Sequence, residues 1–393
     1  MSSRIYAELR GDRVIWMIFA LLALFSIIIS YSATGTLAFR NRGGDTSFYL
    51  LKQVGILGFG FILTYICYLL HPKRYSKIAA TLFLVSIPLL AYTLILGADI
   101  NDARRWVEVP FTGLTFQTSD FAEIALIMYL AKVLSISEYI KDFNSAFLPI
   151  IVPVIVVCGL ILPADLSTAG LIFTTAMLMM FIGRVDLKYI VLLIMCGIVL
   201  FAAMFILGQF TDIVRSDTWV RRLQEFMSNE DGGFQIQQSK MAIAGGGVFG
   251  IGPGNSIARN YLPSAQSDCV FAIICEEYGL IGGFTIMSLY LLLLFRVARL
   301  VTVSSKGFGA MLALGLTLSI VIQALANIAV TVHLVPVTGL TLPMLSYGGT
   351  SLIFTCISFG IILSVSKNIQ KISEPQPATE GFGKQDGGGR NRN

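Results

Sequence analysis

Long apolar runs separated by short polar connections dominate the hydrophobicity pattern of this 393-residue chain. A helix needs roughly 20 residues to cross about 30 Å of hydrocarbon, and runs of about that length recur along nearly the whole sequence. The pattern therefore predicts an all-α polytopic membrane protein with about ten transmembrane helices. We expect these helices near 14–31, 50–70, 77–97, 119–136, 147–163, 167–183, 188–207, 268–295, 308–332 and 346–366.

The connections divide the chain into one membrane domain and two ends. We expect a cytoplasmic N-terminus at 1–13 and a ten-helix domain at 14–367, whose first run lacks a small-residue cleavage site and so resembles a retained helix. The connection 208–267 is far longer than the others, which predicts a structured, functional extracytoplasmic loop over the mouth of the bundle. The segment 368–393 is rich in Gly, Pro and charge and predicts a disordered cytoplasmic tail.

Composition and charge agree with a membrane location. The chain is 55% hydrophobic and only 13% charged, which excludes an ordinary soluble domain. With the N-terminus inside, about 18 of the 28 Lys and Arg residues fall on the inner side, as the positive-inside rule requires. Both termini are therefore expected in the cytoplasm. The six cysteines lack metal-ligand spacing and only two histidines are present, which argues against a His-based metal site and a Ser-His-Asp triad.

Asp268 is the first candidate for chemistry, because it stands where the long loop enters an apolar helix. A carboxylate at that position can cap the helix by accepting backbone N–H bonds. Partial desolvation at the membrane boundary can also raise its pKa toward the range of a general base. The two roles are compatible, and the residue pattern leaves both open.

Glu276 and Glu277 follow deeper in the same apolar helix, about 12 to 14 Å from Asp268 at 1.5 Å per residue. Charges at that depth are costly and usually face a partner or a functional path. At 100° per residue they lie about 80° and 180° around the axis from Asp268, so we do not expect both to serve one site.

Three cations on the outer side are candidates for binding phosphate. Arg104 and Arg105 precede Trp106, a pattern that also suits an interfacial anchor with snorkelling arginines. Arginine is well shaped to hold phosphate oxygens with a forked pair of donors. Lys240 in the long loop adds a third cation, and together they could hold the diphosphate of a lipid-linked sugar.

Other polar residues cluster at the outer ends of spans. Gln117 and Asp120 lie at the entry of the fourth span, and Asp165 begins the sixth, where a capping role is favoured. Ser346 and His333 belong to outer helix turns that structure alone explains. The Gly-rich stretch 245–254 lacks a following GK[ST] motif and a preceding strand, so it is interpreted as a turn-rich re-entrant or surface segment rather than a phosphate loop.

At these residues the chain resembles the SEDS family of FtsW, RodA and SpoVE membrane glycosyltransferases. The resemblance covers nearly the whole membrane domain, and GPGNS and GLTLP are most similar to the cell-division member FtsW. The motifs that carry it are ARRW at 103–106, QTSD at 117–120, PADLSTA at 163–169, GPGNS at 252–256, YLPSAQSDCVFAIICEEYGLIGG at 261–283 and GLTLPMLSYGGTS at 339–351.

The resemblance implies a peptidoglycan glycosyltransferase that polymerises lipid II into glycan strands at the division septum of a bacterial inner membrane. It assigns the family's essential outer carboxylate to Asp268, as the base that deprotonates the incoming sugar 4-hydroxyl while lipid diphosphate leaves. The residues implied to bind substrate are Arg104, Arg105, Lys240, Gln117 and Asp120, with Glu276, Glu277, Asp165 and Ser346 in support.

The same resemblance sets the expected cofactors and partners. A divalent cation such as Mg²⁺ or Mn²⁺ can assist the diphosphate, with its ligands unassigned, and no organic cofactor is expected. The partners implied are lipid II, the nascent glycan strand, a class B penicillin-binding transpeptidase and other divisome membrane proteins, but no nucleic acid.

Departures from the family pattern keep two alternatives open. This chain has QTSD where the family usually has QPSE, and Glu123 where a lysine often follows. It has ADLS where the family has PDLG, and AQSD where the family has AHTD. The implied roles of Asp120 and Asp165, and any proton relay by the residue before Asp268, therefore lose support. One alternative is a lipid II flippase with Glu276 or Glu277 on its path. The other is a non-catalytic scaffold for division proteins.

Overall fold

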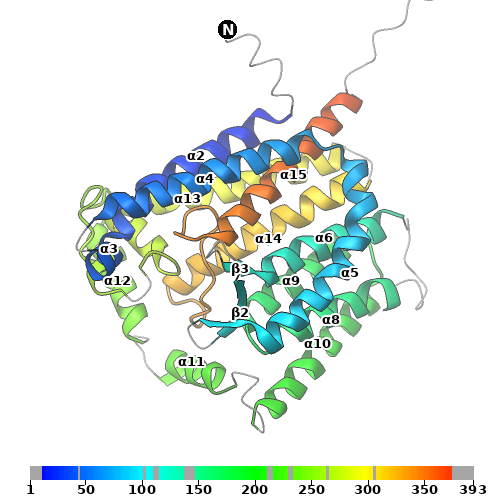
Figure 1. Ribbon diagram of the computed structural model, residues 1–393, viewed down its shortest axis with the longest axis horizontal. Coiled ribbons are helices and arrows are strands. Elements are labelled where there is room, and N and C mark those ends of the chain that lie inside the picture. Colours follow the sequence, from blue (N-terminus) through cyan, green and yellow to red (C-terminus); the bar gives the residue numbers. More distant parts are fainter. Residues whose placement is uncertain are drawn as a thin grey trace, which may run out of the picture.

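The structure, a computed structural model, describes residues 11–42, 45–100, 103–108, 115–136, 147–209, 216–228, 233–262, 265–303 and 307–373. Its helices are α2 (Arg13–Ala33), α3 (Gly35–Arg42), α4 (Thr46–Leu69), α5 (Pro72–Leu96), α6 (Thr118–Ile136), α8 (Val152–Ile161), α9 (Leu166–Ile182), α10 (Leu187–Gly208), α11 (Ser216–Ser228), α12 (Phe234–Gly246), α13 (Val270–Val303), α14 (Phe308–Thr331) and α15 (Thr350–Ser373). A π-helical turn (Phe147–Ile151) precedes α8, and a 3₁₀ turn (Ala258–Asn260) follows α12. Figure 1 shows them as one bundle.

The ten predicted spans each coincide with a helix. Within the described residues, seven helices are long and apolar enough to cross a membrane, namely α2, α4, α5, α10, α13, α14 and α15. The helices at 148–161 and 166–182 are apolar but shorter, and α6 contains Asp120, Glu123 and Lys132. The predicted polytopic, all-α architecture is therefore confirmed.

α14 forms the centre of the bundle, with 72% of its most apolar window buried, against 11% for the peripheral α10. It packs against α6, α9, α13 and α15. Close packing is possible because Gly315 has no side chain: a Cβ there would lie 2.7 Å from both Ile127 Cγ2 and Met179 Sδ. A helix that is apolar on every side fits this central position.

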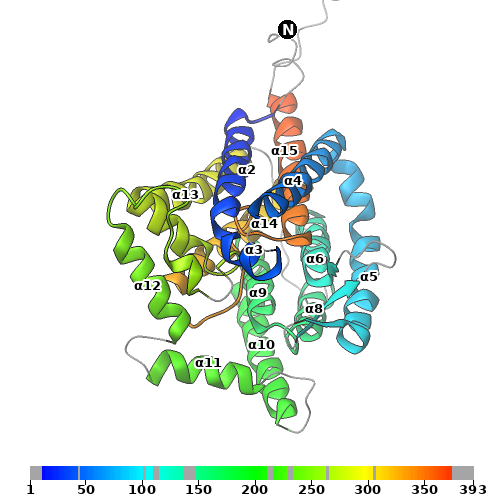
Figure 2. The same ribbon diagram turned by 60° about the vertical axis from the view of Figure 1, so that its left-hand side comes forward.

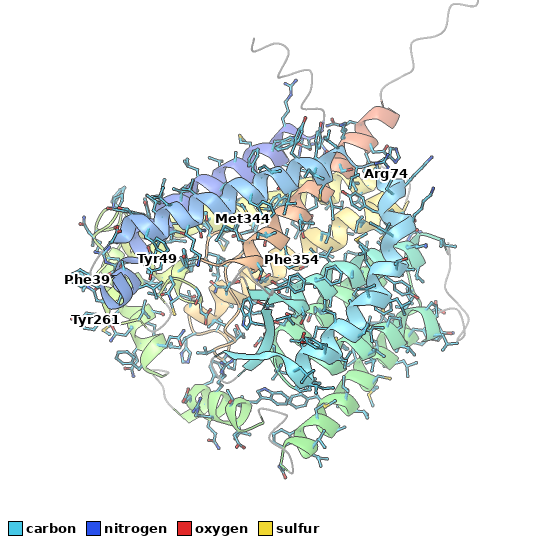
Figure 3. The ribbon with its side chains drawn as sticks, in the orientation of Figure 1. Phe39, Tyr49, Arg74, Tyr261, Met344 and Phe354 are labelled. Carbon is cyan, nitrogen blue, oxygen red and sulfur yellow. The ribbon has the colours of Figure 1, made fainter. Side chains whose placement is uncertain are left out.

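A small antiparallel sheet lies between α5 and α6, and the sequence did not predict it. Its strands are β1 (Ala98–Ile100), β2 (Ala103–Glu108) and β3 (Thr115–Gln117), in that order. Trp106 pairs with Gln117 across β2 and β3, just before α6 begins. Phe116 packs edge-on against Phe354 of α15 with ring centroids 5.5 Å apart, which attaches the sheet to the bundle (Figure 3).

α13 is broken at Gly279, and the Gly-rich stretch fills the break. Gly279 has φ 67° and ψ −168°, outside the helical region. The Ile251 and Gly252 amides donate to the carbonyls of Glu276 and Glu277, and the Leu280 amide donates to the Gly247 carbonyl. The stretch is therefore a turn-rich segment bonded to a broken helix, as interpreted from the sequence.

The two ends of the described chain meet on one side of the bundle, opposite α11 (Figure 2). Asp12, 2% exposed, caps α2 through the Val14 amide and pairs with Arg296 of α13 at 2.6 Å. The Asp12 amide donates to the Ser366 hydroxyl of α15 at 2.8 Å. These bonds join α2, α13 and α15 at this side. α15 runs to Ser373, and residues 374–393 lie outside the described part of the chain.

Candidate functional site

A polar cavity of about 350 Å³ brings together four of the residues singled out in the sequence: Gln117, Asp120, Asp165 and Asp268. They come from the end of β3, the start of α6, the N-cap of α9 and the turn before α13. The other lining residues are Trp106, Glu123, Thr168, Leu171, Arg222, Ser267, Gln323, Thr338, Gly339, Leu340, Thr341, Tyr347, Gly348, Gly349 and Ser351. Segments about 230 residues apart thus build one site.

Three hydrogen bonds to its backbone fix the turn that carries Asp268. The Asn327 side chain donates to the Asp268 carbonyl at 2.9 Å and to the Leu340 carbonyl at 2.7 Å. The Ser346 hydroxyl donates to the Ser267 carbonyl at 2.6 Å, and the Tyr347 amide donates to the Gln266 carbonyl at 2.8 Å. Bonds to backbone carbonyls position this turn, and the Asp268 carboxylate faces the cavity that it lines.

The segment opposite Asp268 bends at Gly339, which has φ 77°. A Cβ on Gly339 would lie 3.7 Å from Asp268 Oδ2, so the backbone of this segment passes close to the carboxylate. Only glycine adopts such a φ without strain, and its lack of a side chain keeps this part of the cavity open. α13 begins at Val270, two residues after Asp268.

Cys269, next to Asp268, is buried and accepts a hydrogen bond from the Gln235 side chain at 2.9 Å. Burial raises the pKa of the Cys269 thiol to about 11. The thiol is therefore neutral at physiological pH and does not compete with Asp268 as a base or a nucleophile.

Asp165 caps α9, as predicted: its carboxylate accepts from the Ser167 and Thr168 amides, both at 3.1 Å, and from the Thr168 hydroxyl at 2.7 Å. It also lines the polar cavity. Capping and lining are thus combined in one carboxylate at the positive end of a helix.

The α6 side of the cavity holds two more acids one helical turn apart. Asp120 Oδ2 is buried without a hydrogen-bond partner among the described atoms. Glu123 accepts a short hydrogen bond from the Ser319 hydroxyl of α14. Gln117 donates to the Ser119 hydroxyl at 3.0 Å, which orients its amide at the cavity edge.

Of the three predicted cations, none has a described side chain in the cavity. The backbone of Arg104 and Arg105 lies in β2, but their side chains lie outside the described part of the structure. Lys240 lies on α12 and does not line either large cavity in the described structure. Burial and, secondarily, the charge of Lys240 lower the pKa of His333, which places this lysine near the end of α14.

Sequence reasoning did not select Arg222, which lines the polar cavity from α11. Its Nη1 donates to the carbonyls of Val337 and Thr338 at 3.1 and 3.2 Å. In the sequence it is one of two adjacent arginines in a long loop, and nothing there distinguishes it from Arg221.

Glu276 and Glu277 are buried away from the cavity, 5% and 2% exposed. Glu276 accepts hydrogen bonds from the Ile257 and Ala258 amides at 3.1 and 3.2 Å. Glu277 accepts from the Ser256 amide at 3.3 Å, while the Ser256 hydroxyl donates to Glu276. Neither carboxylate joins the Asp268 cavity; both serve one separate network, in which they hold residues 256–258 against α13.

A second, apolar cavity of about 970 Å³ adjoins the polar one. Asp165, Arg222 and Thr338 line both, so the two spaces meet at these residues. Its other lining residues are Ala164, Leu166, Ser167, Phe201, Phe205, Thr218, Trp219, Val220, Leu223, Gln224, Met227, Pro336 and Val337. The walls come from α9, α10, α11 and the chain after α14, at the lower end of the bundle in Figure 2.

Among the described residues, no three His, Cys, Asp or Glu side chains are placed to hold a metal ion. Mg²⁺ commonly needs just one or two carboxylates when substrate phosphates supply the remaining oxygens. The unpartnered Asp120 oxygen fits that limited role, and the described residues do not form a preformed metal cage.

Comparison with known proteins agrees with this architecture. The family model described as "Cell cycle protein", which covers FtsW, RodA and SpoVE, matches residues 12–371. The chain is 32% identical to a "Probable peptidoglycan glycosyltransferase FtsW" of Trichlorobacter lovleyi, over 91% of this chain and 94% of that protein. It is also 32% identical to the stage V sporulation protein E of Bacillus subtilis, over 91% of this chain and 97% of that protein.

Solved structures are similar in fold. A chain from a study of how a peptidoglycan synthase complex coordinates polymerization and crosslinking superposes with a TM-score of 0.71 and 26% identity, covering 91% of this chain and 98% of that one. The rod shape determining protein RodA of Thermus thermophilus gives a TM-score of 0.65 at 25% identity, covering 91% and 97%. The sequence match over nearly the whole membrane domain, together with this fold, shows that the chain belongs to the FtsW, RodA and SpoVE family of cell cycle proteins.

Proposed function

We propose that the protein is a peptidoglycan glycosyltransferase that polymerises lipid II into glycan strands during septal wall synthesis. The observation that carries the proposal is the junction of the two cavities: a polar space that contains Asp268 opens beside an apolar space at Asp165, Arg222 and Thr338. A lipid-linked sugar has the same division, with a polar head, an apolar tail and phosphates between them.

In the proposed reaction, Asp268 accepts the proton of the 4-hydroxyl of the incoming lipid II sugar. The hydroxyl oxygen forms a bond to the anomeric carbon of the growing strand, and the bond from that carbon to the lipid diphosphate breaks. The electron pair of the broken bond leaves with the diphosphate. General base catalysis of this kind typically contributes about 10²–10⁴-fold, which needs a carboxylate held within hydrogen-bond reach of the hydroxyl.

The apolar cavity suits the polyprenyl tail of such a substrate. Trp219 of α11 stacks on Phe201 of α10 with ring centroids 5.7 Å apart, and this pair forms an aromatic wall of the apolar cavity. The tail enters this cavity from hydrocarbon and not from water, so van der Waals contacts with the walls, about 0.1–0.2 kcal/mol for each atom pair, hold it there.

We expect the reaction to take place on the outer side of the membrane. Both ends of the chain are expected in the cytoplasm, and the protein is expected at the division septum. A class B penicillin-binding transpeptidase is the proposed partner, because a solved relative comes from a study of a peptidoglycan synthase complex that polymerises and crosslinks. Other divisome membrane proteins are proposed as further neighbours. A divalent cation, Mg²⁺ or Mn²⁺, would bind Asp120 together with substrate phosphate and would supply positive charge there.

The flippase alternative has less support. It needs charged groups along a path through the membrane, and Glu276 and Glu277 were its candidates. Both carboxylates are bonded to the 256–258 segment, and neither lines the two large cavities of the described chain. A scaffold, in turn, has no need for a buried carboxylate-lined cavity.

Purified full-length protein, a class B transpeptidase and fluorescent lipid II in liposomes separate these functions. We expect glycan chains from the wild type and none from Asp268→Ala. Translocation of lipid II without polymer would replace the proposal with the flippase, and neither activity, with retained binding to division proteins, would replace it with the scaffold.

A further inference from the structure

Arg222 lies at the boundary between the two cavities, and its surroundings indicate a specific ligand. It lines both the polar and the apolar space, as do Asp165 and Thr338 and no other residue in the described part of the chain. Any ligand with a polar head in one space and an apolar tail in the other must place its connecting group beside these three residues.

Arg222 is also the only cation among the described side chains that line the polar cavity. The same lining contains the carboxylates of Asp120, Glu123, Asp165 and Asp268. A diphosphate next to this acidic wall is repelled unless a cation compensates, and the planar guanidinium is suited to bind phosphate oxygens.

The position of Arg222 is fixed by the backbone that also approaches Asp268. Its Nη1 donates to the carbonyls of Val337 and Thr338, and Gly339, the next residue, passes Asp268 Oδ2. The Ser167 hydroxyl donates to the Thr338 carbonyl at 2.9 Å, which ties this segment to the start of α9 as well. The stretch 337–339 therefore fixes the position of the Arg222 guanidinium relative to the Asp268 carboxylate.

We propose that Arg222 binds the diphosphate of the polyprenyl donor, between the tail in the apolar cavity and the sugar in the polar one. This inference rests on the proposed function. The diphosphate that departs is bonded to the same carbon that the hydroxyl attacks, so it belongs in the cavity of Asp268. As the C–O bond breaks, negative charge grows on the diphosphate, and Arg222 stabilises that charge by N–H donation while Asp268 holds the proton.

The test measures binding of undecaprenyl diphosphate and undecaprenyl monophosphate to full-length protein in nanodiscs of phosphatidylethanolamine and phosphatidylglycerol. We expect Arg222→Gln to weaken diphosphate binding at least tenfold, with a smaller loss for the monophosphate, and Arg222→Lys to recover part of it. The matched control is Arg221→Gln, because Arg221 is 71% exposed and pairs at 3.9 Å with Glu225. The affinity of this control variant for undecaprenyl diphosphate should stay within twofold of the wild-type affinity.

A second control separates binding from simple attachment of α11. Phe226 of α11 packs edge-on against His333 with ring centroids 5.0 Å apart and lines neither cavity. Phe226→Ala should loosen α11 without changing the preference for diphosphate over monophosphate. If Arg222→Gln retains wild-type affinity, if the wild type binds no diphosphate, or if Phe226→Ala reproduces the same selective loss, the inference is wrong.

Polymerisation by the same samples distinguishes this inference from the proposed function. Wild-type protein that makes glycan chains and binds diphosphate independently of Arg222 contradicts the inference alone. Wild-type protein that makes no glycan with its transpeptidase contradicts the proposed function, whatever the binding data give. Asp268→Asn is expected to lose polymerisation without any loss of diphosphate affinity, because it removes one negative charge from the acidic wall.

Discussion

The hydroxyl of Ser346 donates a hydrogen bond to the carbonyl of Ser267, the residue immediately before Asp268, at 2.6 Å. The same hydroxyl oxygen accepts from the Leu342 amide at 2.8 Å. One buried side chain thus connects the turn after α14 to the turn that carries the candidate base. This relationship connects Ser346, which does not line the cavity, to the site that Tyr347, Gly348, Gly349 and Ser351 of the same SYGGTS turn line.

Replacement of Ser346 by Ala should lower both stability and polymerisation. Two buried backbone groups lose their partner, at a cost of about 1–3 kcal/mol for each unsatisfied group, and the Asp268 turn loses a constraint. Thermal unfolding in detergent and a lipid II polymerisation rate measure the two effects. Ser358→Ala is the control, because the Ser358 hydroxyl donates to the Phe354 carbonyl within α15. A full polymerisation rate in Ser346→Ala would show that the Asp268 turn does not need the Ser346 hydrogen bonds.

Glu276→Ala should release residues 256–258 from α13. The carboxylate accepts from the Ile257 and Ala258 amides, and hydrogen bonds to a buried charge are worth about 1.5–3 kcal/mol. Hydrogen exchange of residues 255–262 should rise in this variant. Glu225→Ala, which removes a side chain 48% exposed, should leave that exchange unchanged, and equal exchange in both variants would refute the structural role of Glu276.

The Asp12–Arg296 pair should dominate stability at the side where the chain ends meet. Asp12→Asn keeps an oxygen for the α2 cap but leaves the half-buried guanidinium without its ion-pair partner, and such losses cost about 3–5 kcal/mol for buried pairs. Thermal unfolding provides the measurement. Lys188→Ala breaks an exposed pair, 61% and 44% accessible, and should leave the unfolding temperature nearly unchanged. Similar values for the two variants would contradict the burial argument.

Trp219→Ala should discriminate between substrates by tail length. It removes an aromatic wall of the apolar cavity and the contacts of that wall with the tail, each worth about 0.1–0.2 kcal/mol, so we expect kcat/KM to fall about tenfold. The loss is expected for undecaprenyl lipid II and should be much smaller for a short-chain analogue. Phe249→Ala is the control, because Phe249 is 82% exposed and lines neither cavity; equal losses for both chain lengths would place the tail elsewhere.

The spans were predictable because membrane crossing imposes a length and an apolar composition on each helix. The break in α13 was not, since GLIGG has the same hydropathy whether or not Gly279 leaves the helical region. The small sheet at 98–117 was missed because its three strands are three to six residues long and their pairing depends on the bundle beneath. The network around Glu276 and Glu277 was not predictable, because it depends on residues 256–258 folding back to reach both carboxylates.

The candidate site was predictable where a residue had a motif around it, as for Asp268, Gln117, Asp120 and Asp165. Arg222 had none, and its role depends on where α11 packs against residues 333–338, which no local pattern specifies. Lys240 is the opposite case: α12 holds it outside both cavities of the described chain, and its predicted role in binding diphosphate stays a prediction.

The polymerisation rate of Asp268→Asn, measured with saturating lipid II and the transpeptidase present, tests the central claim most directly. The amide has the size of the carboxylate but cannot take up the proton, so we expect a rate loss of at least about 10²-fold with unchanged thermal stability and no loss of undecaprenyl diphosphate binding. A variant that elongates glycan strands at the wild-type rate would contradict the account.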